Sequence, residues 1–274
     1  MDERPPASPG VRLRMVPKEH GASFMSAHAL LLGIVAGFVG GGRSVTGLLL
    51  ALVVGALFLP FTAAVSALTH RKLAPAARRR TLEIGAALAI AGALALWMGP
   101  ARELLGVAVT GGVLGALYLI ARIRTGPRSM VTELTAIAGI SLLAPLAWLL
   151  IAGPSTRWQL APVAAFLSFG GTVPYVRERV RRRRLREPAL ARRMREGALA
   201  LAWQAATLLV AAAGVSAGRI HPLVLASFVP GAVKTLGGIA RPETAPPMRR
   251  LGYVETAVST AFAVMAGIGL AMAS

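Results

Sequence analysis

The stretch WQLAPVAAFLSFGGTVPYVRERVRRRRLREPALARRMREG, Trp158–Gly197, joins an apolar run directly to a block of basic residues. Its second half holds ten arginines, from Arg177 to Arg195, and three glutamates. An apolar segment that ends in clustered positive charge is typical of a membrane span where it meets the cytoplasm. Basic blocks also bind nucleic acid or phosphorylated lipids, so the rest of the chain has to decide between these uses.

The composition favours a membrane protein. Of 274 residues, 55% are hydrophobic and only 15% are charged, which is too apolar for a soluble globular protein. The apolar residues form runs of roughly 17–25 residues, the length that crosses a ~30 Å hydrocarbon core as a helix. The sequence therefore predicts an all-α fold, a polytopic transmembrane helix bundle.

Nine spans are predicted, in a 4+4+1 arrangement. We expect them near residues 21–42, 44–69, 82–100, 103–121, 130–152, 158–176, 197–217, 220–240 and 251–273. The first 20 residues are polar and lack the apolar centre of a cleaved signal peptide. We therefore predict a cytoplasmic N-terminal tail over residues 1–20 and a single nine-helix transmembrane domain over residues 21–274. In the first span, Gly33, Gly37 and Gly41 repeat every four residues and predict a face for close helix packing.

The positive charges predict the orientation. With these spans, 26 of the 30 lysines and arginines fall on one side of the membrane and four on the other. Because cytoplasmic loops are enriched in these residues, we expect the inner (plasma) membrane, a cytoplasmic N-terminus and a C-terminus outside. A nucleic-acid partner is not expected, since no aromatic residue lies between Arg177 and Arg195.

No metal site or cofactor is predicted. The chain has no cysteine, and its four histidines show no metal-ligand spacing. His28, inside the first span, is interpreted as a hydrogen-bonding partner of a neighbouring helix, with a ligand role as the alternative.

Two strings carry a family resemblance. VPKEHGASFMSAHALLLGIVAG, Val16–Gly37, and RRLGYVETAVS, Arg249–Ser259, resemble the YwiC-like family of bacterial membrane proteins, whose function is not established. The layout is more distantly similar to the UbiA superfamily of membrane prenyltransferases, which have nine helices and catalytic loops after the second and sixth. The two most basic loops of this chain follow the second and sixth spans, four helices apart.

The chain departs from the UbiA pattern in its acidic residues. UbiA-type enzymes use aspartate-rich motifs in both loops to hold magnesium, which takes carboxylate and phosphate oxygens. This chain has one aspartate, Asp2, in its N-terminal tail. Magnesium-dependent prenyl transfer is therefore not expected.

Three residues are candidate catalytic groups. Glu19 and His20 lie where the chain enters the first span, and Glu133 lies at the start of the fifth. The alternative for Glu19 is an ion pair with Lys18 at the membrane surface. The alternative for Glu133 is to neutralise the arginines at 122, 124 and 128. Glu255 is interpreted as a local ion-pair partner of Arg249 and Arg250.

A second set of residues is predicted to bind an anionic lipid. Guanidinium groups bind phosphate through paired hydrogen bonds, and tyrosines anchor at membrane interfaces. The candidates are Lys18, Arg71, Lys72, Tyr118, Tyr175, Arg177 and Arg181. The alternative is an orientation signal that binds anionic lipid without specificity. Arg182 and Arg183 are expected to belong to the generic basic surface.

Three functions remain open from the sequence. The first is a non-catalytic protein that binds, carries or senses an isoprenoid or a phosphate-bearing membrane lipid. The second is a divergent enzyme on a UbiA-like scaffold that uses Glu19, His20 and Glu133 in place of the aspartates. The third is a small-solute transporter.

Overall fold

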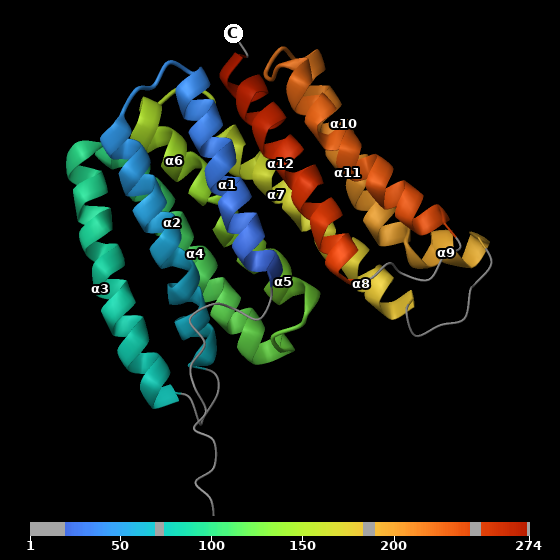
Figure 1. Cartoon of the computed structure of the whole chain (residues 1–274), viewed down its shortest axis with the longest axis horizontal. Helices are drawn as coiled ribbons and strands as arrows, with labels where there is room; N and C mark the ends of the chain where they lie inside the picture. The colour runs from blue at the N-terminus through green and yellow to red at the C-terminus, as the bar shows by residue number, and fades with distance from the viewer. Residues whose placement is uncertain (1–19, 69–73, 183–189, 242–247, 273–274) are drawn as a thin grey trace, which may run out of the picture.

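The computed structural model describes residues 20–68, 74–182, 190–241 and 248–272, and every regular element in these ranges is an α-helix (Figure 1). The predicted all-helical fold is confirmed. The helices are α1 (His20–Val39), α2 (Val45–Ala67), α3 (Ala74–Met98), α4 (Ala101–Thr125), α5 (Met130–Ser141), α6 (Leu143–Ala152), α7 (Leu160–Gly170), α8 (Thr172–Arg182), α9 (Leu190–Glu196), α10 (Ala198–Ser216), α11 (Pro222–Ala240) and α12 (Met248–Met272).

The nine predicted spans coincide with these helices, apart from the additional helix α9. Two of the spans are each divided into two helices. The fifth predicted span is α5 followed by α6, and the sixth is α7 followed by α8. Each break lies three residues before a proline, Pro145 or Pro174. Proline has no N–H, so the carbonyls of Ser141 and Gly170 lose their helical hydrogen bonds there.

Seven segments are long and apolar enough to cross a membrane, with α5 and α6 counted as one. The described chain is therefore a multi-pass membrane protein. The two predicted spans outside this set are α1, whose apolar part is Phe24–Val39, and α7, which has 11 residues and continues into the basic helix α8. The short helix α9 was not predicted.

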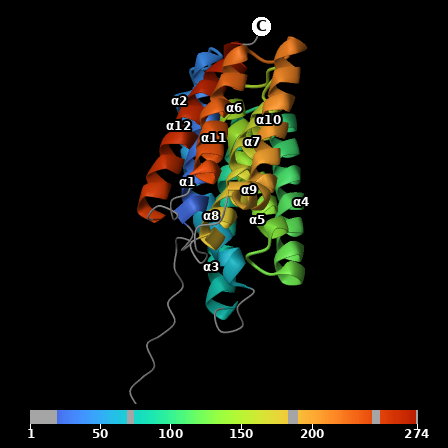
Figure 2. The same ribbon diagram turned by 90° about the vertical axis from the view of Figure 1, so that its right-hand side faces the viewer.

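The helices form a ring in chain order. Each of the nine predicted spans packs against the next, and α12 returns to pack against α1 (Figure 1). Figure 2 shows the same helices side on, running along one common direction. Helix α6, the second half of the fifth span, packs against both α1 and α2. Most of its residues are buried, including Trp148, Leu149 and Ile151.

Glycines allow α6 to approach its neighbours. A Cβ at Gly33 would lie 2.1 Å from the carbonyl oxygen of Ala144, and one at Gly47 would lie 1.9 Å from that of Leu150. A Cβ at Gly37 would lie 3.0 Å from Ile151. The predicted packing face is thus confirmed at Gly33 and Gly37. Gly41 follows the end of α1 and has a φ of +88°, so it serves the turn into α2.

The start of α1 and the end of α12 lie at opposite ends of the bundle (Figure 1). This is what an odd number of crossings requires. Helices α8 and α9 lie at the end where α1 begins. The most basic part of the chain is therefore gathered at one end of the bundle.

Replacing Gly33 by alanine should destabilise the protein. The added methyl group meets a backbone carbonyl that cannot move away, and overpacking of this kind costs about 1–3 kcal/mol. Gly112 in α4 is the matched control, because a Cβ there meets nothing within 4 Å. There the change should be neutral or stabilising by up to about 1 kcal/mol, because alanine is the better helix former. Thermal unfolding in detergent measures both variants, and equal stability would contradict the close packing of α1 on α6.

Candidate anion-binding site around helix α8

Helix α8 has two chemically different faces. Tyr175, Glu178, Arg179 and Arg182 follow the spacing of one helix face and are all buried. Arg177 and Arg181, four residues apart, lie on another face and are more exposed. The helix therefore presents charge both to the interior of the bundle and to its surroundings.

The buried arginines bind the end of α11. Arg179 donates from Nη1 to the carbonyl oxygen of Gly238 at 2.7 Å. Arg182 donates from Nη1 to the carbonyls of Gly238 and Ile239 at 3.3 and 3.2 Å. The last four carbonyls of a helix have no partner within the helix and carry partial negative charge. Two guanidinium groups thus complete the C-terminus of α11.

Glu178 and Arg182 form an ion pair inside the protein. Both side chains are 3% exposed. Burial raises the pKa of Glu178 above its ordinary value, and the positive charges of Arg182 and Arg179 oppose that rise. The expectation that Arg182 belongs to a generic basic surface is wrong, because the side chain faces α11.

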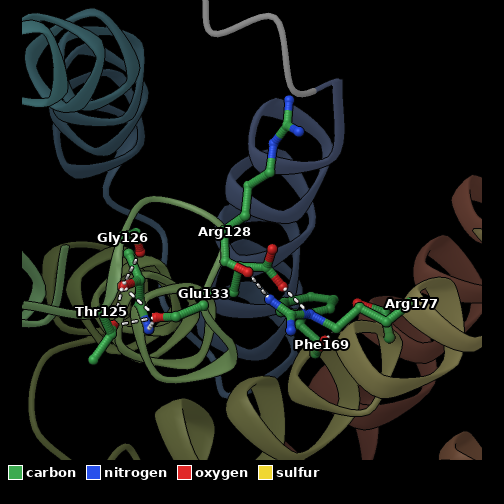
Figure 3. A network of polar contacts seen from close by, with 9 residues as sticks. Thr125, Gly126, Arg128, Glu133, Phe169 and Arg177 are labelled. Carbon is green, nitrogen blue, oxygen red and sulfur yellow. Dashed lines mark hydrogen bonds and ion pairs between the residues drawn. The ribbon is translucent and has the colours of Figure 1, made fainter. Parts of the chain in front are cut away.

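The exposed face of α8 contacts α5. Arg177 donates from Nε to Oε2 of Glu133 at 3.0 Å, and its Nη2 donates to the backbone carbonyl of Arg128 (Figure 3). The side chain of Arg128 points away from Glu133. Glu133 thus pairs with an arginine 44 residues further along the chain.

Arg181 of α8 and Arg192 of α9 contact the same carboxylate, that of Glu196 in α9. Nη2 of Arg181 lies 3.8 Å from Glu196, and Nε of Arg192 donates to the same carboxylate at 3.0 Å. The side chains of Arg181 and Arg192 are 57% and 56% exposed. These two arginines therefore have similar exposure and contact the same carboxylate from two different helices.

Tyr175 connects α8 to a second ion pair. Lys234 of α11 lies over the Tyr175 ring, 5.0 Å from its centre, and donates to Oε2 of Glu255 in α12 at 2.6 Å. The tyrosine also packs closely on α11, since a Cβ at Gly238 would lie 2.4 Å from the Tyr175 hydroxyl. Glu255 thus pairs across helices.

Two further predicted residues lie away from α8. Tyr118 of α4 shares a 2.8 Å hydrogen bond with Ser66 of α2 and accepts one from Arg122 at 3.2 Å. His28 of α1 is hydrogen-bonded through Nε2 to Thr260 of α12 at 2.9 Å, which confirms its predicted bond to a neighbouring helix. The structure does not place Tyr118 with Tyr175.

Several sequence candidates lie outside the described residues. These are Lys18, Glu19, Arg71, Lys72 and the side chain of His20. Arg183 lies outside them as well. Within the described ranges, no three His, Asp or Glu side chains gather as metal ligands would.

The residues predicted from the sequence did not include three that line the site, Glu178, Arg179 and Lys234. A signal for the first two was present, since their spacing from Tyr175 places them on one helix face. Lys234 was counted only as a charge near the end of a span. Charged residues within spans are rare and usually functional, so its position was itself a signal.

The fold and this site define a multi-pass helical membrane protein with a charged end. Residues 16–148 match the family model described as YwiC-like protein, so the predicted resemblance to that family is confirmed over this range. The second string that suggested the family, Arg249–Ser259, lies outside the match. No curated protein matches the chain. No solved structure matches it either.

Arg182→Gln should destabilise the protein much more than Arg181→Gln. The first change leaves Glu178 buried without its ion-pair partner, and breaking such a pair costs about 3–5 kcal/mol. The second removes an exposed ion pair worth about 1 kcal/mol or less. Thermal unfolding in detergent compares the two variants, and the double variant Glu178→Gln/Arg182→Gln should recover part of the loss. Equal behaviour of the single variants would contradict the burial of Arg182.

Proposed function

We propose that this membrane protein binds an isoprenoid or other lipid with a phosphate-bearing headgroup at the α8 end of the bundle, without magnesium-dependent prenyl transfer. The observation that carries the proposal is an excess of buried positive charge. Arg179, Arg182 and Arg193 are 5%, 3% and 8% exposed, and the Lys234 side chain is 10% exposed. In this part of the described chain the mostly buried carboxylates are Glu178, Glu255 and Glu196, and Glu196 is already shared by Arg181 and Arg192.

Buried charge of one sign needs compensation. An ionised group away from water is costly unless it is paired and hydrogen-bonded. Arg179, Arg182 and Arg193 each bury an Nε that has no hydrogen-bond partner among the described residues. A phosphate supplies both the negative charge and the acceptor oxygens that these donors lack.

The exposed face gives a ligand its approach. Arg177 and Arg181 are 39% and 57% exposed. Among the described residues, Arg177 contacts the carboxylate of Glu133 and Arg181 contacts that of Glu196. We propose that these two arginines receive the headgroup at the rim and that the buried arginines set the positive potential behind them.

The ring of nine spans supports the proposed UbiA-like arrangement. In that arrangement, the α8 end is where the scaffold holds a diphosphate. The ion pair of Glu133 with Arg177 favours a binding role for this region over catalysis by Glu133. The predicted catalytic pair Glu19 and His20 remains the alternative.

We further propose that the α8 end faces the cytoplasm across the inner membrane. Positive charge at this end of the described chain includes Arg79 and Arg80 at the start of α3 and Arg122 and Arg124 at the end of α4. Enrichment of arginine and lysine on the cytoplasmic side supports this orientation.

Arg181→Gln should weaken the binding of an anionic phospholipid about tenfold or more. A charge-assisted hydrogen bond is worth roughly 1.5–3 kcal/mol, which corresponds to that factor. Arg192→Gln is the matched control, since both arginines are equally exposed and share Glu196. Native mass spectrometry with phosphatidylglycerol, against phosphatidylcholine, measures the binding at low and high salt. Equal losses in both variants that vanish at high salt would show a nonspecific basic surface.

Reporter fusions test the orientation. Cytoplasm-active reporters should work after residues near 75, 125, 188 and 245, and periplasm-active reporters after Ser274. The reason is the uneven distribution of lysine and arginine. A C-terminus that reports from the cytoplasm would overturn both the proposed orientation and the nine-span count.

A further inference from the structure

A small polar cavity lies among α7, the first residue of α8, α10, α11 and α12. Its volume is about 20 Å³, enough for one water molecule, which needs roughly 10–15 Å³ by this measure. It lies next to the Lys234–Glu255 ion pair, within the apolar segments Pro222–Ala240 and Gly252–Met272. The polar residues that line it are Ser168, Thr172, Gln204, Ser227, Lys234, Glu255 and Ser259.

The cavity wall is rich in hydrogen-bond acceptors. Thr172 donates its hydroxyl hydrogen to the carbonyl of Phe169, and Ser227 donates to that of Val224, both at 2.6 Å. Each hydroxyl oxygen keeps lone pairs that can accept. Oε1 of Glu255 is buried without a hydrogen-bond partner among the described residues. The buried oxygen of Glu255 can therefore accept a hydrogen bond from a small molecule in the cavity.

The second oxygen of Glu255 is already engaged. Oε2 accepts the 2.6 Å hydrogen bond from Lys234, whose side chain is nine-tenths buried. A metal cation in the cavity would therefore meet the repulsion of the ammonium group at close range. A water molecule meets no such repulsion and can donate to Glu255 and a hydroxyl oxygen together.

We propose that this cavity binds one water molecule and that Glu255 takes up and releases a proton through it. The proton comes from solution, passes through the water and binds Oε1 of Glu255, which becomes a neutral carboxyl group. Lys234 keeps its proton and loses its counter-ion. Ionisable pairs within membrane segments commonly mark proton pathways.

The charged groups around the pair belong to three neighbouring helices. From α8, the ring of Tyr175 faces Lys234, and Glu178, Arg179 and Arg182 lie on the same buried helix face as Tyr175. Lys234 itself comes from α11. His28 of α1 reaches Thr260 of α12, five residues beyond Glu255. The polar cavity residues of α7 and α10, Ser168 and Gln204, do not titrate.

Protonation has a structural consequence. The Lys234–Glu255 pair joins α11 to α12, and α12 packs on α1 to close the ring. A neutral Glu255 removes the charge attraction from this joint. Lys234 then keeps its cation–π contact with the Tyr175 ring in α8. The proton site therefore acts on the two contacts of Lys234 in α11, one with Tyr175 of α8 and one with Glu255 of α12.

Infrared titration of the full-length protein in lipid vesicles tests the proposal. A carbonyl band of a protonated carboxyl group should appear on acidification and shift in heavy water. Glu255→Gln should lose this band, whereas Glu133→Gln and Glu178→Gln should keep it. A Glu255→Gln spectrum that matches the unmodified protein would overturn the proposal.

Three further variants separate protonation from folding. Glu255→Asp keeps a carboxyl group and should move the band without abolishing it. Lys234→Met leaves the carboxylate without its counter-ion, and it should show the band without acidification, because a buried unpaired charge neutralises. Ser227→Val fills the cavity and should slow the heavy-water shift. An unchanged rate in Ser227→Val would overturn the role of the water. Lipid binding at Arg181 is measured separately, so either proposal can fail alone.

Discussion

The close approach of α6 to α1 and α2 is the contact on which the bundle depends. At Gly33 and Gly47 the backbones come so near that no side-chain atom fits between them. Membrane helices associate through such packing, because lipid offers no hydrophobic drive to bring them together. Helix α6 also contacts α4, α5 and α7, and α12 closes the ring on α1. The position of α8 follows, since it continues the chain from α7 after the break at Gly171, three residues before Pro174.

The hydrogen bonds from α8 to α11 have two effects, one on the stability of the fold and one on its electrostatics. The last carbonyls of α11 require donors, and in an apolar environment each unsatisfied group costs several kcal/mol. Arg179 and Arg182 supply those donors. They also bring positive charge into the bundle, which Glu178 offsets only in part. The same residues thus stabilise the fold and create the potential that favours an anion.

The sequence predicted the helices well because span length and apolar runs follow directly from the thickness of a bilayer. The four-residue spacing of Tyr175 and Arg179 also places them on one helix face, because this depends only on helix periodicity. The sequence did not predict that the face with Arg182 is the buried one, because arginine-rich faces are usually solvated. The pairing of Glu133 with Arg177 and of Lys234 with Glu255 was also missed. These partners are 44 and 21 residues apart and meet only through packing.

Packing around Gly238 restricts which residue types can occupy position 238. The Gly238 carbonyl accepts from two arginines, and its Cα lies under the ring of Tyr175. Any side chain at position 238 would displace Tyr175, and Lys234 would lose its contact with the Tyr175 ring. Positions 175 and 238 should therefore covary among homologous sequences: where the aromatic residue is kept the glycine is kept, and a smaller residue at 175 releases 238 to change.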